Sequence, residues 1–388
     1  MIAFVVPRYG DQVMGGAEAL CRALAGALHR AGNAVEVFTT CAVDHFSWAD
    51  ALPPGSTVED DIAVHRFPVG PRDPARFSDR HHGINGGDQL DPAQEIEWMM
   101  QSVWSPGLLD ALQERDNEIR CRVAMPYLFG TTYWAVAQNP EKTVLLPCLH
   151  DEPHAHTGAV RNMLESSAGC LANVPAEDRL IGTLAPRAKT AVGGFGFNPL
   201  TRPADGAKFC AERSIAPGYL LYAGRREEAK GLPMLFANYA EYVKRRPDAP
   251  PLALMGSGDL TPPREIRDRV IDLGLVPEDQ KHDAMSGASV LVHPSRLESF
   301  GAVLIEAWQA RVPALVFGRS QVLVDHCRAA GGGLWFNDYP TFAASLDHLL
   351  SDPALRERMG SSGERYVREV YGWDAVLTRF HAALDAWV

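Results

Sequence analysis

Residues 2–39, IAFVVPRYGDQVMGGAEALCRALAGALHRAGNAVEVFT, decide the fold class of this 388-residue chain. The segment begins with a short apolar run, Ile2–Val6, which is typical of a parallel strand buried on both faces. A glycine-bearing loop follows, then apolar residues at helical spacing over about residues 17–31, and the alternating segment AVEVFT at 34–39. Strand, loop, helix and strand in this order predict one unit of an open α/β sheet.

The rest of the chain continues this pattern and then repeats it. In the first half, further strands are expected at Val144–Pro147 and Ala191–Gly194. A second series begins after about residue 212, with buried strands expected at Tyr219–Ala223, Pro251–Met255, Ser289–His293 and Ala314–Phe317. Because 388 residues exceed one ordinary core, we predict two Rossmann-like, doubly wound α/β domains, residues 1–200 and 201–370.

Two other segments differ from this pattern. Residues 68–94 are rich in Pro, Gly and Asp and have no periodicity, so we expect a long surface loop there. Such a loop is either a mobile lid that faces an acceptor or a plain insertion. Residues 371–388 follow a break at YGWD and are expected to form an amphipathic helix.

The composition, with 46% hydrophobic and 22% charged residues, is that of an ordinary globular protein. A net charge of −11 argues against a nucleic-acid-binding protein, which normally has a basic face. Residues 1–200 hold 15 Lys and Arg against 24 Asp and Glu, a balance of −9, which leaves −2 for the remainder. A broad basic surface for anionic lipid is therefore not indicated, and only a local patch remains compatible with this balance.

The seven cysteines are scattered and form no CxxC pair, so we expect reduced thiols and neither a zinc site nor a disulfide framework. No uncharged apolar run approaches the roughly 18 residues of a membrane span, and the N-terminus lacks a signal leader. We therefore expect a cytoplasmic protein, soluble or at most in peripheral contact with the inner face of a membrane.

Two short motifs lie where open α/β sheets bind ligands, after the carboxyl ends of strands. Gly15 and Gly16 precede the first helix, where a closely approaching backbone and free N–H groups attract anions; a simple tight turn is the alternative. GRREEAKG, residues 224–231, places Arg225 and Lys230 after a buried strand. Two cations there suit a pyrophosphate, and a solvated charged turn is the alternative.

The strongest pattern is HPSRLESFGAVLIEAWQARVPALV, residues 293–316. A buried strand is followed by a loop that carries Glu298, and Glu306 lies eight residues later, inside the expected helix. We expect the backbone N–H groups of residues 300–302 to lie at the start of that helix, where an anion would bind. The spacing alone leaves open that Glu298 is only a capping acid and Glu306 a helix-surface residue.

Together these motifs resemble glycosyltransferase family 4, whose second domain carries a GR-x(4)-KG element and a later E-x(7)-E element. The segments LMGSGD (254–259) and LGLVPEDQ (273–280) are also similar, and the resemblance runs along the whole chain, most sharply over 219–316. It implies the GT-B fold, in which two Rossmann-like domains face a central cleft and the final helix returns to the first domain. Polysaccharide biosynthesis is the context that it implies.

The activity that the resemblance implies is a retaining, metal-independent transfer. The sugar would move from a UDP- or GDP-sugar to a hydroxyl of a glycan, lipid-linked or small-molecule acceptor, with no cofactor. The residues that would bind the nucleoside diphosphate are Arg225, Lys230 and the backbone at Gly15 and Gly16 for the pyrophosphate, Glu306 for the ribose and Val276 for the base.

The resemblance also implies a sugar site. Glu298 and Ser299, with the amides of Phe300 and Gly301, would hold the donor sugar near its reacting carbon. His150, in LLPCLHDEPHA, matches the histidine that faces the sugar from the first domain, and His150 and Glu298 are the candidate catalytic residues. A lone histidine is more often structural, which is the alternative for His150.

The chain departs from the family at Ser299, where glycine is more frequent, and over residues 318–336, so the base contacts of that segment are not carried over. The acidic triplet at residues 59–61 resembles a metal motif and is expected to be solvated. Three rival functions remain: a GT-B nucleotide-sugar epimerase, a non-catalytic nucleotide-sugar-binding protein, and a Rossmann-type oxidoreductase, which the missing GxGxxG fingerprint disfavours.

Because the nucleotide contacts are expected in the second domain and Gly16 and His150 in the first, we expect donor binding to draw the domains together. The hinge is expected at Phe197–Asp205, with a second crossing near Tyr371–Trp373.

Overall fold

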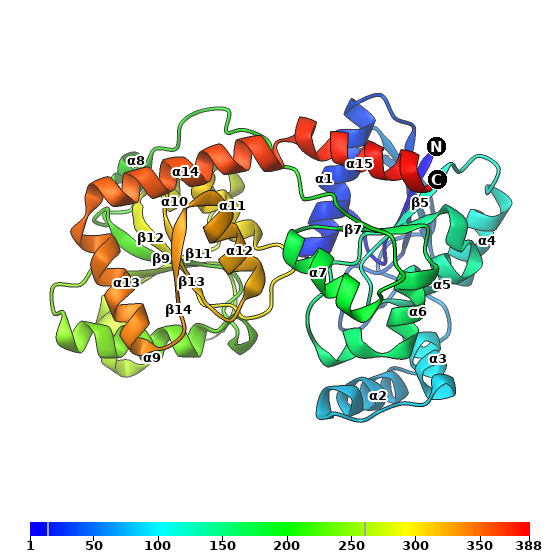
Figure 1. Ribbon diagram of the computed structural model, residues 1–388, viewed down its shortest axis with the longest axis horizontal. Coiled ribbons are helices and arrows are strands. Elements are labelled where there is room, and N and C mark those ends of the chain that lie inside the picture. The colour runs from blue at the N-terminus through cyan, green and yellow to red at the C-terminus, as the bar shows by residue number, and fades with distance from the viewer. Residues whose placement is uncertain (14, 260) are drawn as a thin grey trace. The chain divides into compact units, whose positions relative to one another are not determined.

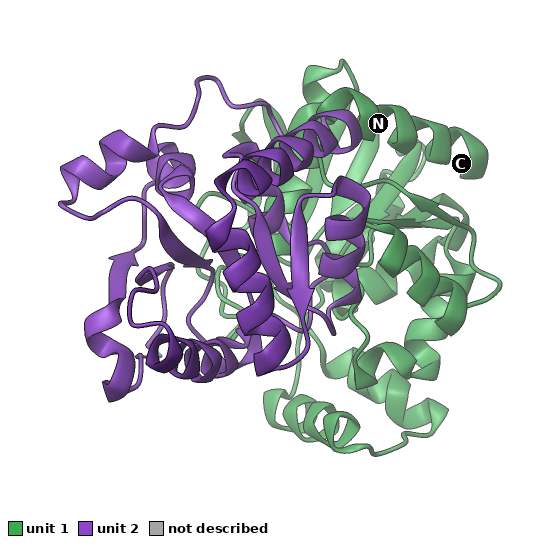
Figure 2. Cartoon of the chain, turned by 60° about the vertical axis from the view of Figure 1, so that its left-hand side comes forward, with its two compact units in different colours: residues 1–196, 373–388 green, residues 197–372 purple. Residues whose placement is uncertain are grey.

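The computed structural model describes residues 1–13, 15–259 and 261–388, and the chain forms two compact units. Unit 1 comprises Met1–Gly196 and Trp373–Val388, and unit 2 comprises Phe197–Gly372 (Figure 2). The first crossing lies four residues before the expected division at residue 200, and the chain re-enters unit 1 at Trp373. Each unit is an α/β sheet with helices on both faces.

The sheet of unit 1 has eight strands in the order β3-β4-β2-β1-β5-β6-β7-β8. All neighbours are parallel except β3 and β4, which form an antiparallel hairpin at the edge. The described strands are β1 (Ile2–Val5), β2 (Val35–Thr40), β3 (Gly55–Glu59), β4 (Ile62–Phe67), β5 (Cys121–Ala124), β6 (Thr143–Leu145), β7 (Gly169–Ala172) and β8 (Thr190–Val192).

The helices of unit 1 cover both faces of this sheet. They are α1 (Gly16–Arg30), α2 (Pro74–Gly86), α3 (Pro92–Gln101), α4 (Pro106–Glu114), α5 (Gly130–Gln138), α6 (Gly158–Ser166), α7 (Pro175–Leu184) and α15 (Trp373–Trp387), with 3-10 turns η1 (Pro140–Lys142) and η2 (Pro153–His156). Successive residues of β1 enter different cores, because strand side chains alternate between the two faces. Ala3 and Val5 pack in one core, and Ile2 and Phe4 in the other.

The predicted amphipathic helix at the C-terminal end is confirmed as α15. Its residues Phe380 and Leu384 are buried in the core that holds Ile2 and Phe4, and Figure 1 shows α15 beside α1. Gly169 on β7 leaves room for the ring of Trp387, which a Cβ at that position would overlap. The helix therefore buries its apolar face against the first unit.

The predicted long loop over residues 68–94 is wrong, because α2 and the start of α3 occupy most of it (Figure 1). Each helix begins with an Asp-Pro pair: Asp73 accepts backbone hydrogen bonds at the start of α2, and Asp91 forms a capping box on α3. The prolines take the first helical position, where their missing N–H costs nothing. Gly87 then ends α2 in a left-handed conformation, with φ of 100°.

The sheet of unit 2 has six parallel strands in the order β11-β10-β9-β12-β13-β14. They are β9 (Tyr219–Ala223), β10 (Leu252–Met255), β11 (Val270–Gly274), β12 (Ala288–His293), β13 (Ala314–Phe317) and β14 (Gly333–Phe336). This is the doubly wound order in which chain direction along the sheet reverses between the first and fourth strands, here β9 and β12. Ligands of such sheets bind outside the carboxyl ends at this switch point.

Helices flank the second sheet as they do the first. They are α8 (Gly206–Glu212), α9 (Leu232–Arg245), α10 (Glu278–Ser286), α11 (Ala302–Gln309), α12 (Gln321–Ala330), α13 (Tyr339–Ser351) and α14 (Pro353–Tyr371), with 3-10 turns η3 (Glu228–Lys230) and η4 (Arg264–Arg269). The strands predicted at 219–223 and 314–317 are confirmed residue for residue. Among the described residues of the whole chain, no helix combines the length and the apolar character needed to cross a membrane.

Candidate active site

A lysine and a glutamate meet at the switch point of the second sheet. Lys230 ends the loop after β9, Glu298 lies in the loop after β12, and the lysine Nζ is 2.8 Å from the glutamate Oε1. Gly231 permits this approach, because a Cβ at that position would collide with the carbonyl oxygen of Pro294. Its φ of 76° is also one that residues with a side chain rarely adopt. The strand order thus brings together two residues that are 68 positions apart.

Glu298 is held as an anion in a mostly buried position. Its side chain is 14% exposed and that of Lys230 is 26% exposed. Burial by itself would raise the pKa of Glu298, but the charges of His293 and Lys230 bring that pKa below its ordinary value. The His293 ring lies behind the pair, with Nε2 3.7 Å from Oε1, and burial lowers its own pKa. The switch point therefore offers a carboxylate and an ammonium group side by side.

The two arginines that follow β9 have different environments. Arg225 is 60% exposed and pairs with Glu227 at 3.0 Å, so its guanidinium remains available to a ligand. The Arg226 side chain is 10% exposed, pairs with Asp272 on β11 and donates to the carbonyl of Leu254. Arg225 is therefore the candidate ligand-binding arginine, whereas Arg226 ties three neighbouring strands together.

The loop before α11 has a fixed backbone. His326 Nε2 donates to the carbonyl of Phe300 at 3.0 Å, and burial lowers the pKa of His326 to about 4, which keeps it neutral. Gly301 has φ of 81°, in the left-handed region, and caps the helix with no side-chain bond. The amides of Gly301 and Ala302 have no acceptor among the described residues, so they are placed to bind an anion.

Glu306 is not a simple surface residue of α11. Its side chain is 18% exposed, and Lys281 on α10 donates to Oε1 at 2.8 Å. Burial raises the pKa of Glu306, and the charge of Lys281 opposes this. Glu278 also binds Lys281, at 2.6 Å. The carboxylate is therefore oriented by a lysine that the sequence patterns did not single out.

The two remaining candidates of unit 2 lie in loops at the same edge of the sheet. Val276 is half-buried between β11 and α10, beside Leu275, which is 70% exposed. Ser299 is half-buried next to Glu298. Apolar side chains at the first position suit a flat base, and a hydroxyl at the second suits a sugar.

In unit 1, the loop before α1 contains a pair that sequence reasoning missed. Glu18, in the first turn of α1, forms a buried ion pair with Arg8. A Cβ on Gly15 would collide with the Glu18 carboxylate, whereas Gly16 faces open space. The predicted close approach of a ligand is therefore sterically open at Gly16, whereas a side chain at Gly15 would have to displace the Glu18 carboxylate.

His150 lies in the loop that follows β6 and is 33% exposed in its side chain. Its Nδ1 is 3.7 Å from Glu152 Oε1, and the hydroxyl of Tyr127 donates to the same carboxylate oxygen. Burial would raise the pKa of Glu152, but hydrogen bonds from His150 and Tyr127 lower it. His150 thus has a carboxylate partner two residues along the chain, inside the LHDEPH segment.

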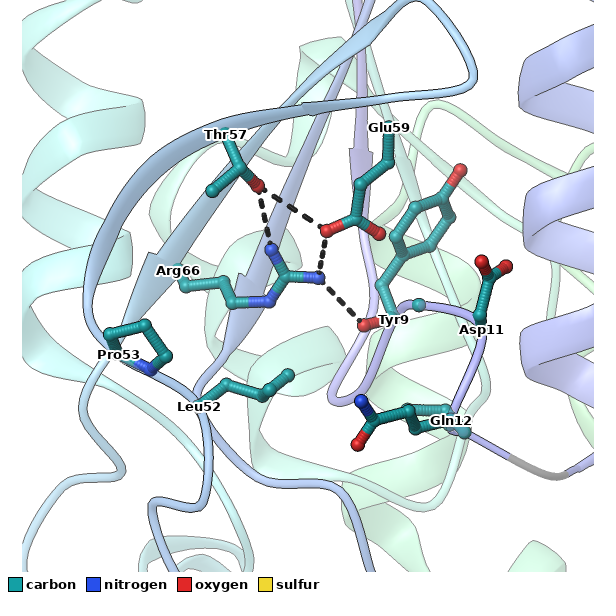
Figure 3. Close-up of a pocket in the computed structure, with 10 residues that line it drawn as sticks. Tyr9, Asp11, Gln12, Leu52, Pro53, Thr57, Glu59 and Arg66 are labelled. Carbon is teal, nitrogen blue, oxygen red and sulfur yellow. Dashed lines mark hydrogen bonds and ion pairs between the residues drawn. The ribbon is translucent and has the colours of Figure 1, made fainter.

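Unit 1 also has a hollow of about 270 Å³ at the carboxyl edge of its sheet, next to the loop that follows β1 (Figure 3). Arg66 lines it and is fixed by Glu59 at 2.6 Å, by the hydroxyl of Thr57 and by the carbonyl of Tyr9. Its other lining residues are Gly10, Asp11, Gln12, Val13, Leu52 and Pro53. The hollow thus combines carboxylates and an amide with an apolar wall.

Asp60 and Asp61 of the acidic triplet at residues 59–61 are exposed to solvent, as expected, and two of the three acids pair with arginines. Glu59 pairs with Arg66, and Asp60 pairs with Arg22 at 2.8 Å. Within the described parts of the chain, no cluster of three or more His, Cys, Asp or Glu side chains has the arrangement of a metal site. All seven cysteines are buried and unpaired.

Residues 214–366, nearly all of unit 2, match the family described as glycosyl transferases group 1. The D-inositol 3-phosphate glycosyltransferase of Streptomyces avermitilis is 31% identical over 246 residues, which are 58% of this chain and 53% of that protein. The protein with the same name in Pseudarthrobacter chlorophenolicus is 26% identical over 98% of this chain and 93% of its own length. The first match thus spans about half of its relative, and the second nearly all.

Solved structures show the same fold over the whole chain. Sucrose-phosphate synthase from Thermosynechococcus elongatus has a TM-score of 0.73 at 20% identity, and 99% of each chain is covered. The Anabaena protein HepE in complex with UDP has a TM-score of 0.69 at 15% identity, also with 99% of each chain covered.

Two doubly wound, largely parallel sheets, together with the likeness to these structures, define the GT-B fold. Unit 2 matches glycosyl transferases group 1 over residues 214–366, and this match, together with the curated relatives, supports a glycosyltransferase. The expected fold class and the resemblance to a glycosyltransferase family are therefore confirmed.

Several supporting residues of the site escaped the sequence patterns. Lys281 binds Glu306 from α10, and His326 binds the carbonyl of Phe300 from α12. No periodicity in the sequence marks such contacts. Glu152 could have been predicted, because it lies two residues after the candidate His150 in the segment LLPCLHDEPHA.

Proposed function

We propose that the protein transfers a sugar from a nucleotide-diphosphate sugar to a hydroxyl of a glycan, lipid-linked or small-molecule acceptor, with retention of the anomeric configuration and without a metal ion. The observation that carries this proposal is the Lys230–Glu298 pair at the switch point of unit 2, 2.8 Å apart. A diphosphate leaving group needs a cation, and a sugar carbon that becomes positive needs an anion. This pair supplies both at one place.

In the proposed reaction, the bond between the anomeric carbon and the diphosphate oxygen breaks, and the nucleoside diphosphate takes the bonding electrons. The Lys230 ammonium group, the exposed Arg225 guanidinium and the amides at Gly301 and Ala302 offset its growing negative charge. The acceptor oxygen forms the new bond to the same face of the carbon, and its proton passes to the departing phosphate oxygen. No charge is left unbalanced.

Glu298 acts in this scheme by its charge. Its pKa is held below the ordinary value, so it stays ionised beside the carbon at which positive charge develops. A covalent route through the same carboxylate is the less favoured alternative, because Lys230 already occupies one of its oxygens and lowers its basicity. His150 would assist from unit 1 at the sugar, supported by Glu152.

The nucleoside is assigned to the neighbouring part of unit 2. The Glu306 carboxylate, oriented by Lys281, would accept hydrogen bonds from the ribose hydroxyls, and the base would pack against Val276. The binding of UDP by the fold neighbour HepE favours UDP over GDP as the nucleotide.

The hollow of unit 1 is our candidate for part of the acceptor site (Figure 3). Asp11 pairs with Arg22 and Glu59 pairs with Arg66, so the lining offers carboxylate oxygens whose charge is already balanced. Such oxygens can accept hydrogen bonds from hydroxyl groups. The names of the D-inositol 3-phosphate glycosyltransferases favour a polyol acceptor, and the hollow would then hold its hydroxyl-bearing part.

Chelation tests the metal-free part of the proposal. The carboxylates near the site are already paired, Glu298 with Lys230 and Glu306 with Lys281, so the chain offers cations rather than metal ligands to the diphosphate. With a panel of UDP- and GDP-sugars and mixed acceptors, we expect acceptor-dependent nucleotide release to be unchanged by EDTA. Release that EDTA abolishes and Mg²⁺ restores would show that the mechanism depends on a metal.

A further inference from the structure

A buried carboxylate lies directly behind His150 and has no part in the scheme above. Glu177 is in the first turn of α7 and is 2% exposed. One of its oxygens accepts the backbone N–H of Leu149 at 2.6 Å. The other accepts the backbone N–H of Asn173 at 2.6 Å and its side-chain amide at 3.0 Å. This carboxylate therefore joins the loops that follow β6 and β7 at the carboxyl edge of the sheet.

The backbone that Glu177 holds is strained. Cys148 has φ of 52°, in the left-handed region that non-glycine residues adopt only at a cost of about 1 kcal/mol or more. Asn173 Nδ2 donates to the sulfur of Cys148 at 3.7 Å, and Glu177 binds the next residue, Leu149. Such a conformation persists only where surrounding bonds enforce it. His150 comes immediately after these two residues.

We propose that Glu177 is a positioning residue, which fixes the Leu149 backbone and thereby the place of the His150 imidazole at the sugar. This inference rests on the proposed role of His150. Glu152, which accepts a hydrogen bond from Tyr127, faces the imidazole from the ring side, and Glu177 holds the preceding Leu149 backbone. When Glu177 is ionised, both oxygens accept. When it is protonated, one oxygen carries a hydrogen that opposes an N–H donor, and a bond to the loop is lost.

The change in the protonation of Glu177 falls near neutral pH. Burial raises the pKa of Glu177 to about 7, although its hydrogen bonds from Leu149 and Asn173 oppose the shift. The titratable groups that face it are His150 and Cys148 on the loop after β6 and Cys170 on β7. Burial raises the pKa of both thiols, to about 12 for Cys170, so they remain neutral near pH 7. Above about pH 7 the ionised carboxylate holds the loop through both oxygens, and below it the protonated form gives up one of these acceptors.

The test compares the pH dependence of kcat in the intact protein with that of Glu177→Gln. The wild type should lose kcat as the pH falls through about 7. Glu177→Gln keeps one acceptor oxygen, so at pH 8 its kcat should be at least tenfold lower than that of the wild type, while its donor KM should stay within twofold. The loss of kcat below about pH 7, the acid limb of the profile, should be absent from this variant. Glu177→Asp keeps the charge and should recover the limb. Glu141→Gln, at an exposed carboxylate of the same unit, is the matched control and should match the wild type.

The outcomes separate this inference from the proposed function. If His150→Ala lowers kcat but Glu177→Gln has wild-type kcat and an unchanged acid limb, the positioning role is wrong and the role of His150 stands. If His150→Ala leaves kcat unchanged, the proposed role of His150 fails first. Should Glu177→Gln not fold, Glu177→Asp alone decides: an unaltered kcat at pH 8 despite the shorter reach contradicts the inference.

Discussion

Lys230→Met should lower kcat by about a thousandfold, the upper end of what one preorganised charge contributes to a transition state. The lysine is the cation at the switch point of unit 2, and it lies 2.8 Å from the carboxylate assigned to the sugar. Its loss removes the charge that meets the departing diphosphate. It also frees the pKa of Glu298 to rise, because the lysine is one of the charges that lower it. Steady-state kinetics at saturating donor measures the effect.

The same change should reduce stability by about 1 to 3 kcal/mol, the cost of leaving a mostly buried acceptor without its partner. The folded-state pKa of Glu298 is lowered, so its ionised form adds stability above the unfolded pKa, and this is lost as the pH falls through the folded value. Adding Glu298→Gln to Lys230→Met should restore much of the stability and none of the activity. Lys244→Met, at a 67% exposed lysine of α9, is the control. A Lys230→Met enzyme with more than a tenth of wild-type kcat contradicts the assignment.

Arg225→Ala should weaken the binding of a nucleoside diphosphate by about 1.5 to 3 kcal/mol, the worth of charge-assisted hydrogen bonds to phosphate. The adjacent arginine provides the control. Arg226 is 10% exposed and committed to Asp272 and Leu254, so Arg226→Ala should lower the unfolding temperature and leave the affinity of the folded protein nearly unchanged.

Isothermal titration calorimetry with UDP and GDP, together with thermal unfolding, distinguishes the two arginines. If Arg226→Ala loses the affinity and Arg225→Ala keeps it, the diphosphate lies against a different part of the loop that follows β9.

The strands of the second sheet were predictable because burial on both faces leaves continuous apolar runs, as in YLLYA at 219–223. The helix α2 and the start of α3 were missed because apolar residues are few over 68–94, and only one residue of α2, Ile84, is fully buried. Their caps carried the signal instead: Asp73-Pro74 and Asp91-Pro92 are N-cap and first-turn pairs. In a segment rich in Pro and Asp, these pairs look the same as turn residues.

The site was predictable where a residue follows a strand and carries its own motif, as Lys230 and Glu298 do. Their meeting depends on strand order, which places β9 beside β12. Partners such as Lys281 and Glu177 carry no such mark. Each contacts the site from a helix that follows a different strand, and the contacts depend on how helices pack on the sheet. Long-range packing of this kind has no periodicity along the chain.

The central claim is that this chain moves a sugar from a nucleotide-diphosphate donor to a hydroxyl with retention. The most direct measurement is NMR of the anomeric proton during turnover of an α-linked UDP- or GDP-sugar with a polyol or glycan acceptor, with released nucleotide counted in parallel. We expect one nucleoside diphosphate for each new glycosidic bond, and an α-linked product. A β-linked product, or an altered sugar with no new glycosidic bond, would contradict the claim.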